Sequence, residues 1–281
     1  MNPLKYILIV ALLILALPQN TVCQSYDEWL DIGLRQLQED QMDSAKISFK
    51  NLYKSDKKDH KILAVRGLIK TAIFKSDLSE IDSLIDIGDS LCLNEKYNKS
   101  IFLFDLIKAE YHKKNSEYNK ALKIYQSTMP KGKLLSDIDF EYAGGLQHYG
   151  LVYQTLSKYD SCSFYLEQAN DIFRRKKDTT SLQYAMLCNN LGTNYLRLSD
   201  LKKSKTAFKK AIEVLHNLDA PSIGYIAMIN GNLASIYSRE GKYNDAIALV
   251  EESLAHNKSL NDKDIGLVLY ISESLTRPLV I

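Results

Sequence analysis

Residues 189–215 read NNLGTNYLRLSDLKKSKTAFKKAIEVL, and the spacing of small and large residues in this segment indicates the fold class. It is typical of two antiparallel helices joined by a short turn. Gly192 and Ser204 are small, so the backbones of the two helices can approach closely at these positions. Leu191, Tyr195 and Phe208 are predicted to fill the space between the helices and toward the next pair.

The same pattern returns once later and once earlier in the chain, each time with a period of about 42 residues. The later copy is Leu233, Ala234, Tyr237, Ala246, Val250 and Ser253, and the earlier copy is Tyr149, Gly150, Tyr153, Cys162, Leu166 and Ala169. One residue at the start of each second helix marks the register: Ala45, Ile81, Ala121, Cys162, Ser204 and Ala246. The chain is therefore predicted to be a helical-repeat protein.

The pattern resembles the tetratricopeptide repeat (TPR), in which W-x2-L-G-x2-Y on a first helix is followed by A-x3-F on a second. The resemblance implies an all-α fold, a right-handed α-solenoid of antiparallel helix pairs with about six repeats plus one partial repeat. We expect six repeats over 24–262 and a partial seventh repeat, or C-terminal helix, over 263–281. That last segment is apolar, so either it docks on a partner or a second subunit, or the chain is a shortened form of a longer protein.

Two local features are also predicted. Pro130 and Pro221 should lie between repeats, where a missing N–H does no harm to a helix. Asn119, Asp160 and Asn244 each follow a tyrosine in the turn of a repeat, and we expect them to cap the second helix with their side chains.

Residues 1–23 differ from the rest and are predicted to be a cleaved secretory signal peptide. Lys5 is the only charge before an apolar run over 6–17, which is shorter than the roughly 20 residues that span a bilayer as a helix. An uncleaved membrane anchor and a lipoprotein lipidated at Cys23 are the alternatives. The leader resembles those of Bacteroidetes, which implies a protein secreted to the periplasm or held at the cell envelope of a Gram-negative bacterium.

The composition excludes several functional classes. Lys and Arg number 36 against 34 Asp and Glu, a net charge of +2 that argues against a nucleic-acid partner. The chain contains no phosphate-binding loop, no dinucleotide fingerprint and no zinc-protease or serine-hydrolase motif, so we expect neither an enzyme nor a cofactor. The four cysteines have no metal-ligand spacing, so no metal site is predicted; Cys162 and Cys188 are interpreted as small core residues.

The first helices of TPR solenoids line a concave groove, and residues four apart on such a helix share a face. Asn189, Thr193 and Arg197 form one such row, and Ser235 and Arg239 stand at matching positions one repeat later. Two arginines on neighbouring helices could bind a carboxylate through paired hydrogen bonds. The alternative is that these are ordinary residues of an exposed helix face.

Asn190 and Asn232 each precede the Leu of the repeat motif. This feature, with the long repeat period, resembles kinesin light chains and bacterial peptide-sensing TPR regulators, in which an Asn at this place binds the backbone of an extended peptide. An amide suits this task because it both donates and accepts hydrogen bonds. Local structural hydrogen bonding is the alternative for both residues.

These features predict a non-enzymatic scaffold that binds a peptide or protein segment in its groove. The leader and the long repeats also resemble the extracytoplasmic sensor regions of Bacteroidetes regulators. The alternative function is therefore a shortened input region of a signalling receptor or transcriptional regulator. Self-association through the C-terminal helix, and membrane attachment through an uncleaved leader, are the further partner predictions.

Overall fold

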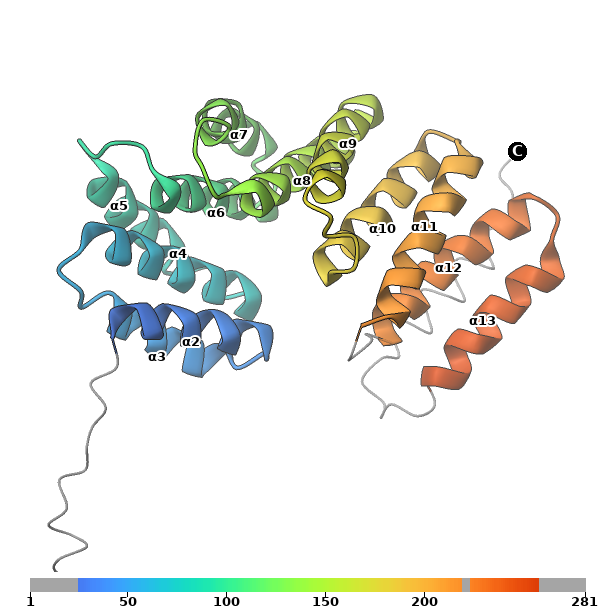
Figure 1. Cartoon of the computed structure of the whole chain (residues 1–281), viewed down its shortest axis with the longest axis horizontal. Helices are drawn as coiled ribbons and strands as arrows, with labels where there is room; N and C mark the ends of the chain where they lie inside the picture. The colour runs from blue at the N-terminus through green and yellow to red at the C-terminus, as the bar shows by residue number, and fades with distance from the viewer. Residues whose placement is uncertain (1–24, 219–222, 258–281) are drawn as a thin grey trace, which may run out of the picture. The chain divides into compact units, whose positions relative to one another are not determined.

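The protein is all-α, as predicted. The computed structural model describes residues 25–218 and 223–257, and no strand occurs in these ranges. Its helices are α2 (Tyr26–Gln38), α3 (Met42–Leu52), α4 (Lys58–Lys75), α5 (Ile81–Cys92), α6 (Lys99–Lys114), α7 (Tyr118–Gly132), α8 (Asp139–Thr155), α9 (Tyr159–Arg175), α10 (Leu182–Arg197), α11 (Leu201–His216), α12 (Ile223–Arg239) and α13 (Tyr243–Asn257) (Figure 1).

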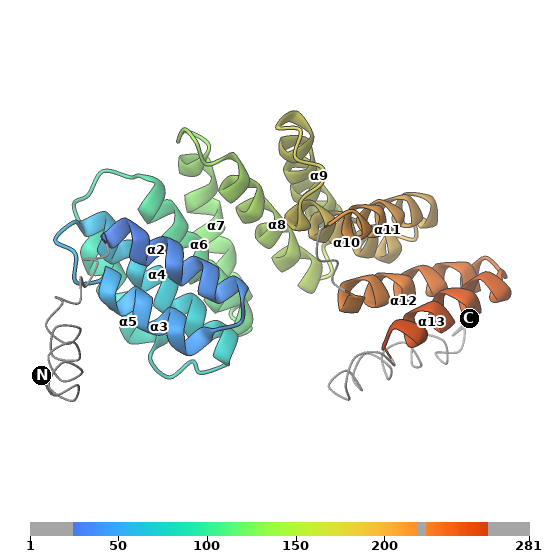
Figure 2. The ribbon, with the colours of Figure 1, turned by 60° about the horizontal axis from the view of Figure 1, so that its bottom comes forward.

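The described residues contain twelve helices, the number that six helix pairs require. The chain divides into two compact units, Met1–Lys108 and Ala109–Ile281, with the division inside α6. In the first unit α3 packs on both α2 and α4; in the second, α8 to α13 pack each on the next (Figures 1 and 2). The limits 24–262 remain a prediction, because both ends of that range fall outside the described residues.

The turn inside each pair has one residue in the left-handed region. These residues are Asp40, Ser76, Ser116, Ser157, Ser199 and Gly241, with φ between 56° and 74°. Each stands at the same distance before the register residue of its pair, so the turns recur at the intervals of the sequence register. After α10, for example, the Ser199 N–H donates to the Leu196 carbonyl at 3.1 Å and the Asp200 N–H to the Tyr195 carbonyl at 2.9 Å. This left-handed helix ending satisfies carbonyls that would otherwise lack donors and reverses the chain in every pair.

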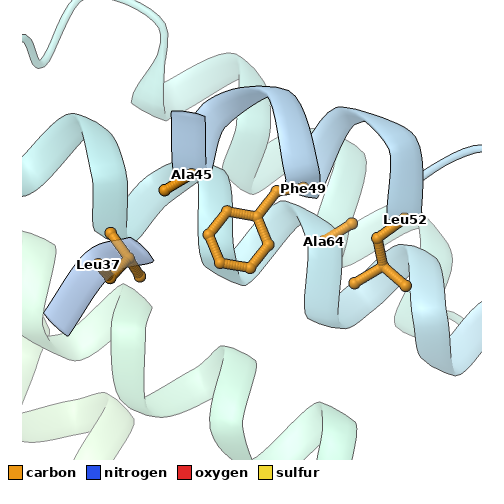
Figure 3. Packing of buried hydrophobic residues seen from close by; sticks show 5 residues of the cluster. All are labelled: Leu37, Ala45, Phe49, Leu52 and Ala64. Atoms are coloured by element: carbon orange, nitrogen blue, oxygen red, sulfur yellow. The ribbon is translucent and has the colours of Figure 1, made fainter. Parts of the chain in front are cut away.

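Large rings on second helices pack against glycines on first helices. In the first unit the Phe49 ring, fully buried, lies among Leu37, Ala45, Leu52 and Ala64 (Figure 3). A Cβ added at Gly33 or Gly67 would come within 2.7 Å or 2.4 Å of this ring, so only glycine permits α2 and α4 to approach it.

The 189–215 segment has the same construction. In the α10–α11 pair, Phe208 is fully buried, and a Cβ added at Gly192 would lie 2.6 Å from its ring. Ser204 is also fully buried, and its Oγ donates to the Gly192 carbonyl at 2.7 Å. The prediction that these small and large residues form the contact between the helices is confirmed.

Two local predictions are wrong. Pro130 lies inside α7, in its last turn, rather than between repeats, whereas Pro221 falls outside the described residues. The carbonyl that loses its donor there belongs to Gln126, an exposed residue, so water can replace the missing N–H. Asn119, Asp160 and Asn244 are not N-caps, because α7, α9 and α13 each begin one residue earlier, at the tyrosine. Neither α7 nor α9 has a side-chain cap.

The predicted leader (1–23) and the partial seventh repeat (263–281) lie outside the described residues. Within the described residues, no helix combines the length and the apolar character needed to cross a membrane. Cys162 and Cys188 are buried with free thiols, which agrees with their interpretation as core residues.

Candidate functional site

A cavity of about 270 Å³ opens between α10 and α12, and Leu215 of α11 also lines it. The three helices follow one another in Figures 1 and 2. α10 contributes Ala185, Met186, Asn189 and Asn190, and α12 contributes Tyr225, Met228 and Ile229. Two amides therefore lie among apolar side chains, an arrangement suited to a ligand with both backbone and apolar groups.

The two amides of the cavity differ in their hydrogen bonds. Asn190 is half-buried, and its side chain makes no hydrogen bond to any described residue, so both its donor and its acceptor remain available. The Asn189 side-chain oxygen is buried and likewise has no partner among the described residues. The Asn189 backbone carbonyl accepts a hydrogen bond from the Thr193 hydroxyl at 3.0 Å, which commits Thr193 to its own helix.

The remaining predicted residues do not line this cavity. Arg197 and Arg239 are the last residues of α10 and α12; both are exposed and form no ion pair with described residues. Asn232 and Ser235 are half-buried on α12, beyond the cavity lining. Of the seven predicted residues, the structure therefore brings Asn189 and Asn190 into the cavity.

Sequence reasoning missed the apolar part of the lining. Met186 and Met228 stand one full period apart, so the period that paired Asn190 with Asn232 also pairs these two methionines. Met186 is 37 % exposed and Tyr225 is 39 % exposed, large values for apolar side chains on packed helices. Flexible methionines adapt to varied partners, and the period could have identified them as candidates.

One side-chain arrangement in the first unit has the residue types of a hydrolase. Ser55 Oγ lies 2.8 Å from Nδ1 of His60, and Nε2 of His60 lies 3.2 Å from the Asp27 carboxylate. Ser55 is only 1 % exposed, and its Oγ also accepts a hydrogen bond from the Lys57 N–H. A substrate carbonyl has no access to a hydroxyl in this position, so we interpret the arrangement as a connection between the starts of α2 and α4.

The described residues contain no group of three or more His, Cys, Asp or Glu side chains that could hold a metal ion. The side chains that line the cavity are two amides, one phenol and several apolar groups, and none of them is charged. Such a lining can bind through hydrogen bonds and apolar contact.

Comparison with known proteins identifies the class. A tetratricopeptide repeat model matches residues 186–214, which include most of the 189–215 segment. A search among curated proteins found no matching sequence. The chain therefore contains a tetratricopeptide repeat, and the resemblance seen in the sequence is confirmed.

Similar solved structures are helical-repeat proteins. BtubC (BKLC) from P. vanneervenii has a TM-score of 0.67 at 16% identity, over 85% of this chain and 93% of that one. The TPR-like repeats of a putative kinesin light chain from Podosopora anserina have a TM-score of 0.60 at 13% identity, over 74% of this chain and 100% of that one. A signal-transduction ATPase with a tetratricopeptide repeat sensor from Pyrococcus horikoshii gives 0.70 at 14% identity; 89% of this chain aligns with only 38% of that protein. At these identities the similarity establishes the helical-repeat fold.

Proposed function

We propose that this protein is a non-enzymatic scaffold that binds an extended peptide or protein segment across α10 and α12. The observation that carries the proposal is the Asn190 amide, which has no hydrogen bond to the described residues and lines a cavity whose other side chains, Asn189 apart, are apolar or aromatic. An amide in this state can donate to one peptide carbonyl and accept from one peptide N–H, as the resemblance to peptide-binding TPR proteins implies.

The cavity sets the size of what it can accept. At about 270 Å³ it lies just below the range of about 300–1,000 Å³ that encloses a whole small ligand. We therefore assign it to one apolar side chain of the peptide, in contact with Met186, Tyr225 and Met228. The peptide backbone would then pass over Asn190.

Arg197 and Arg239 extend this proposal to the ends of the two helices. Both are exposed and unpaired among the described residues, so each can bind a carboxylate without breaking an internal ion pair. Asn232 and Ser235 lie between the cavity and Arg239 on α12 and would continue the peptide path.

For location, we propose export to the periplasm or cell envelope, on the basis of the leader-like residues 1–23. The alternative is that the repeats form the input region of a signalling receptor. The similarity to part of a protein with a TPR sensor is consistent with that alternative. Intact mass of the protein from its native cell tests export, since a chain that starts at Gln24 shows a cleaved leader.

Binding is tested with a displayed library of random peptides selected on the full chain. Peptides that use the cavity should bind Asn190→Ala on the order of tenfold more weakly, the equivalent of one lost hydrogen bond to a buried partner. Met186→Glu should weaken them as well, because it places a charge in the apolar part of the lining. Asn244→Ala is the matched control, because Asn244 is an exposed amide on α13. Equal binding by all three variants would reject the site.

The two arginines are tested with the same peptides. Arg197→Ala together with Arg239→Ala should weaken peptides that end in a free carboxylate more than the same peptides with an amidated end. If the two forms lose affinity equally, the arginines do not bind the carboxylate.

A further inference from the structure

A second groove, of about 500 Å³, lies on the other side of α10. Its floor is formed by the α10 residues Tyr184, Cys188, Leu191 and Tyr195, and α9 and α11 form its walls. At 3.6 residues per turn, these four residues point roughly 140–200° away from Met186 around the helix axis. The groove is therefore a separate surface from the α10–α12 cavity.

The floor is mainly apolar and aromatic. The Tyr195 hydroxyl donates to Glu167 at 2.8 Å, and the Tyr184 hydroxyl and the Cys188 thiol lie close enough to affect each other's pKa. Burial raises the pKa of Cys188 to about 11, so the thiol stays protonated at neutral pH. What the floor offers a ligand is contact with ring faces and with Leu191.

The α11 wall is strongly basic. α11 carries five lysines and a single acidic residue, Glu213, whereas the whole chain is nearly balanced at +2. Lys202, Lys203 and Lys210 line the groove, with Asp200 as the one acidic lining residue. Lys203 is 3.8 Å from Asp200 and Lys210 is 2.8 Å from Glu213. Lys202 is exposed and forms no ion pair with the described residues.

From this combination we propose that the α9–α11 groove binds an acidic peptide segment that carries an aromatic or aliphatic side chain. The side chain would lie on Leu191, beside the Tyr195 ring that the Lys203 ammonium covers at 5.2 Å from its centroid, and flanking carboxylates would pair with Lys202 and Lys203. A nucleic acid fits less well, because a phosphate backbone would pair with the lysines without filling the apolar floor.

The proposal is tested with the double substitution Lys202→Glu, Lys203→Glu. Both positions lie in the first turn of α11, where acidic residues are favourable, so the variant should fold. The control is Lys50→Glu with Lys123→Glu, which makes the same change in net charge at exposed positions on α3 and α7.

Peptides are selected on the wild-type chain from a displayed library, and their affinities are compared by fluorescence anisotropy. We expect a class of acidic peptides with an apolar centre that loses at least about tenfold in affinity on Lys202→Glu, Lys203→Glu and little on the control. The same class should bind Asn190→Ala normally, which separates this groove from the α10–α12 cavity.

Three results would overturn the proposal. One is a selection without an acidic class, and another is acidic peptides that bind both charge variants equally. The third is a competition experiment in which a single-stranded oligonucleotide displaces the bound peptides at a lower concentration than a free acidic peptide does. That result would indicate a nucleic-acid surface instead.

Discussion

The packed face and the open faces of α10 differ in how tightly neighbouring atoms constrain their side chains, although one helix carries both. On the packed face, Gly192 lies against the buried Phe208 ring and no atom can be added. On the open faces, Asn190 and Met186 border a cavity, and their side chains are only partly buried. The packed face has to be complementary for the pair to form at all, whereas the open faces are free to be shaped by a ligand. Substitutions on the packed face should therefore change stability, whereas substitutions on the open faces should change ligand binding.

The largest effect is expected from Phe208→Ala. Removal of this fully buried ring leaves a cavity between α10 and α11, so the free energy of unfolding should fall by about 3–5 kcal/mol. Phe164→Ala is the control, because Phe164 is 60 % exposed on α9 and its loss should be small. Urea unfolding followed by circular dichroism measures both. A small loss for Phe208→Ala would mean that the ring does not hold the pair together.

Gly192→Ala should lower the stability of the fold, whereas Gly144→Ala should raise it. A Cβ at Gly192 would lie 2.6 Å from the Phe208 ring, and overpacking of this kind costs about 1–3 kcal/mol. A Cβ at Gly144 on α8 meets no atom within 4 Å, so alanine there should stabilise by about 0.5–1 kcal/mol through its better helix propensity. Thermal unfolding of both variants gives the comparison. Equal shifts of the two melting temperatures would contradict it.

Ser199→Gly should raise stability slightly, because Ser199 ends α10 with φ at 61°. Glycine adopts this conformation without the steric cost of a side chain, and we expect a gain of about 0.5–1 kcal/mol after its larger unfolded-state entropy is counted. Ser199→Ala keeps the strained conformation and should show no gain. If Gly and Ala behave alike in urea unfolding, the left-handed turn is not a strained point of the repeat.

The smallest effect is expected at Glu240, which pairs with Lys205 of α11 and with Lys242. Hydrogen bonds from these two lysines lower the pKa of Glu240 from its ordinary 4.5. Because the folded-state pKa is depressed, the stabilisation is fully present above about pH 4.5 and disappears as the pH falls through the folded-state pKa.

Glu240→Gln should therefore lower the urea midpoint slightly at neutral pH and leave it unchanged in strong acid. Glu251→Gln, at an exposed position on α13, serves as the control. A difference between Glu240→Gln and wild type that persists in strong acid would show that the charge of Glu240 is not responsible.

The sequence predicts the packed parts of this protein because packing in a repeat must recur. Gly192, Ser204 and Phe208 are complementary in size, so their spacing identifies the helix pair, and the same intervals recur at the left-handed turns. Pro130 and the caps at Asn119 and Asp160 were placed wrongly because a helix boundary depends on one residue of backbone geometry, which the repeat period does not specify.

The candidate site was predicted only in part. Asn189 and Asn190 were found because they stand beside the repeat motif, and Met228 could have been found because it stands one period after Met186. Tyr225 carries no such signal, since its place in the cavity depends on how α12 packs against α11. Arg197 and Arg239 stand one period apart, but neither lines the cavity. Each lies at the end of its helix, about two helical turns or roughly 10 Å beyond Asn190 or Asn232.

The most direct test of the central claim uses the five methionines of the chain as probes. The chain is labelled with ¹³C at the methionine methyl groups, and NMR spectra are recorded with and without a peptide selected on the wild type as dependent on Asn190. The proposed site predicts that the signals of Met186 and Met228 shift together, while those of Met42 on α3 and Met129 on α7 stay in place. A peptide that binds but moves Met42 or Met129, and leaves Met186 and Met228 unchanged, would contradict it.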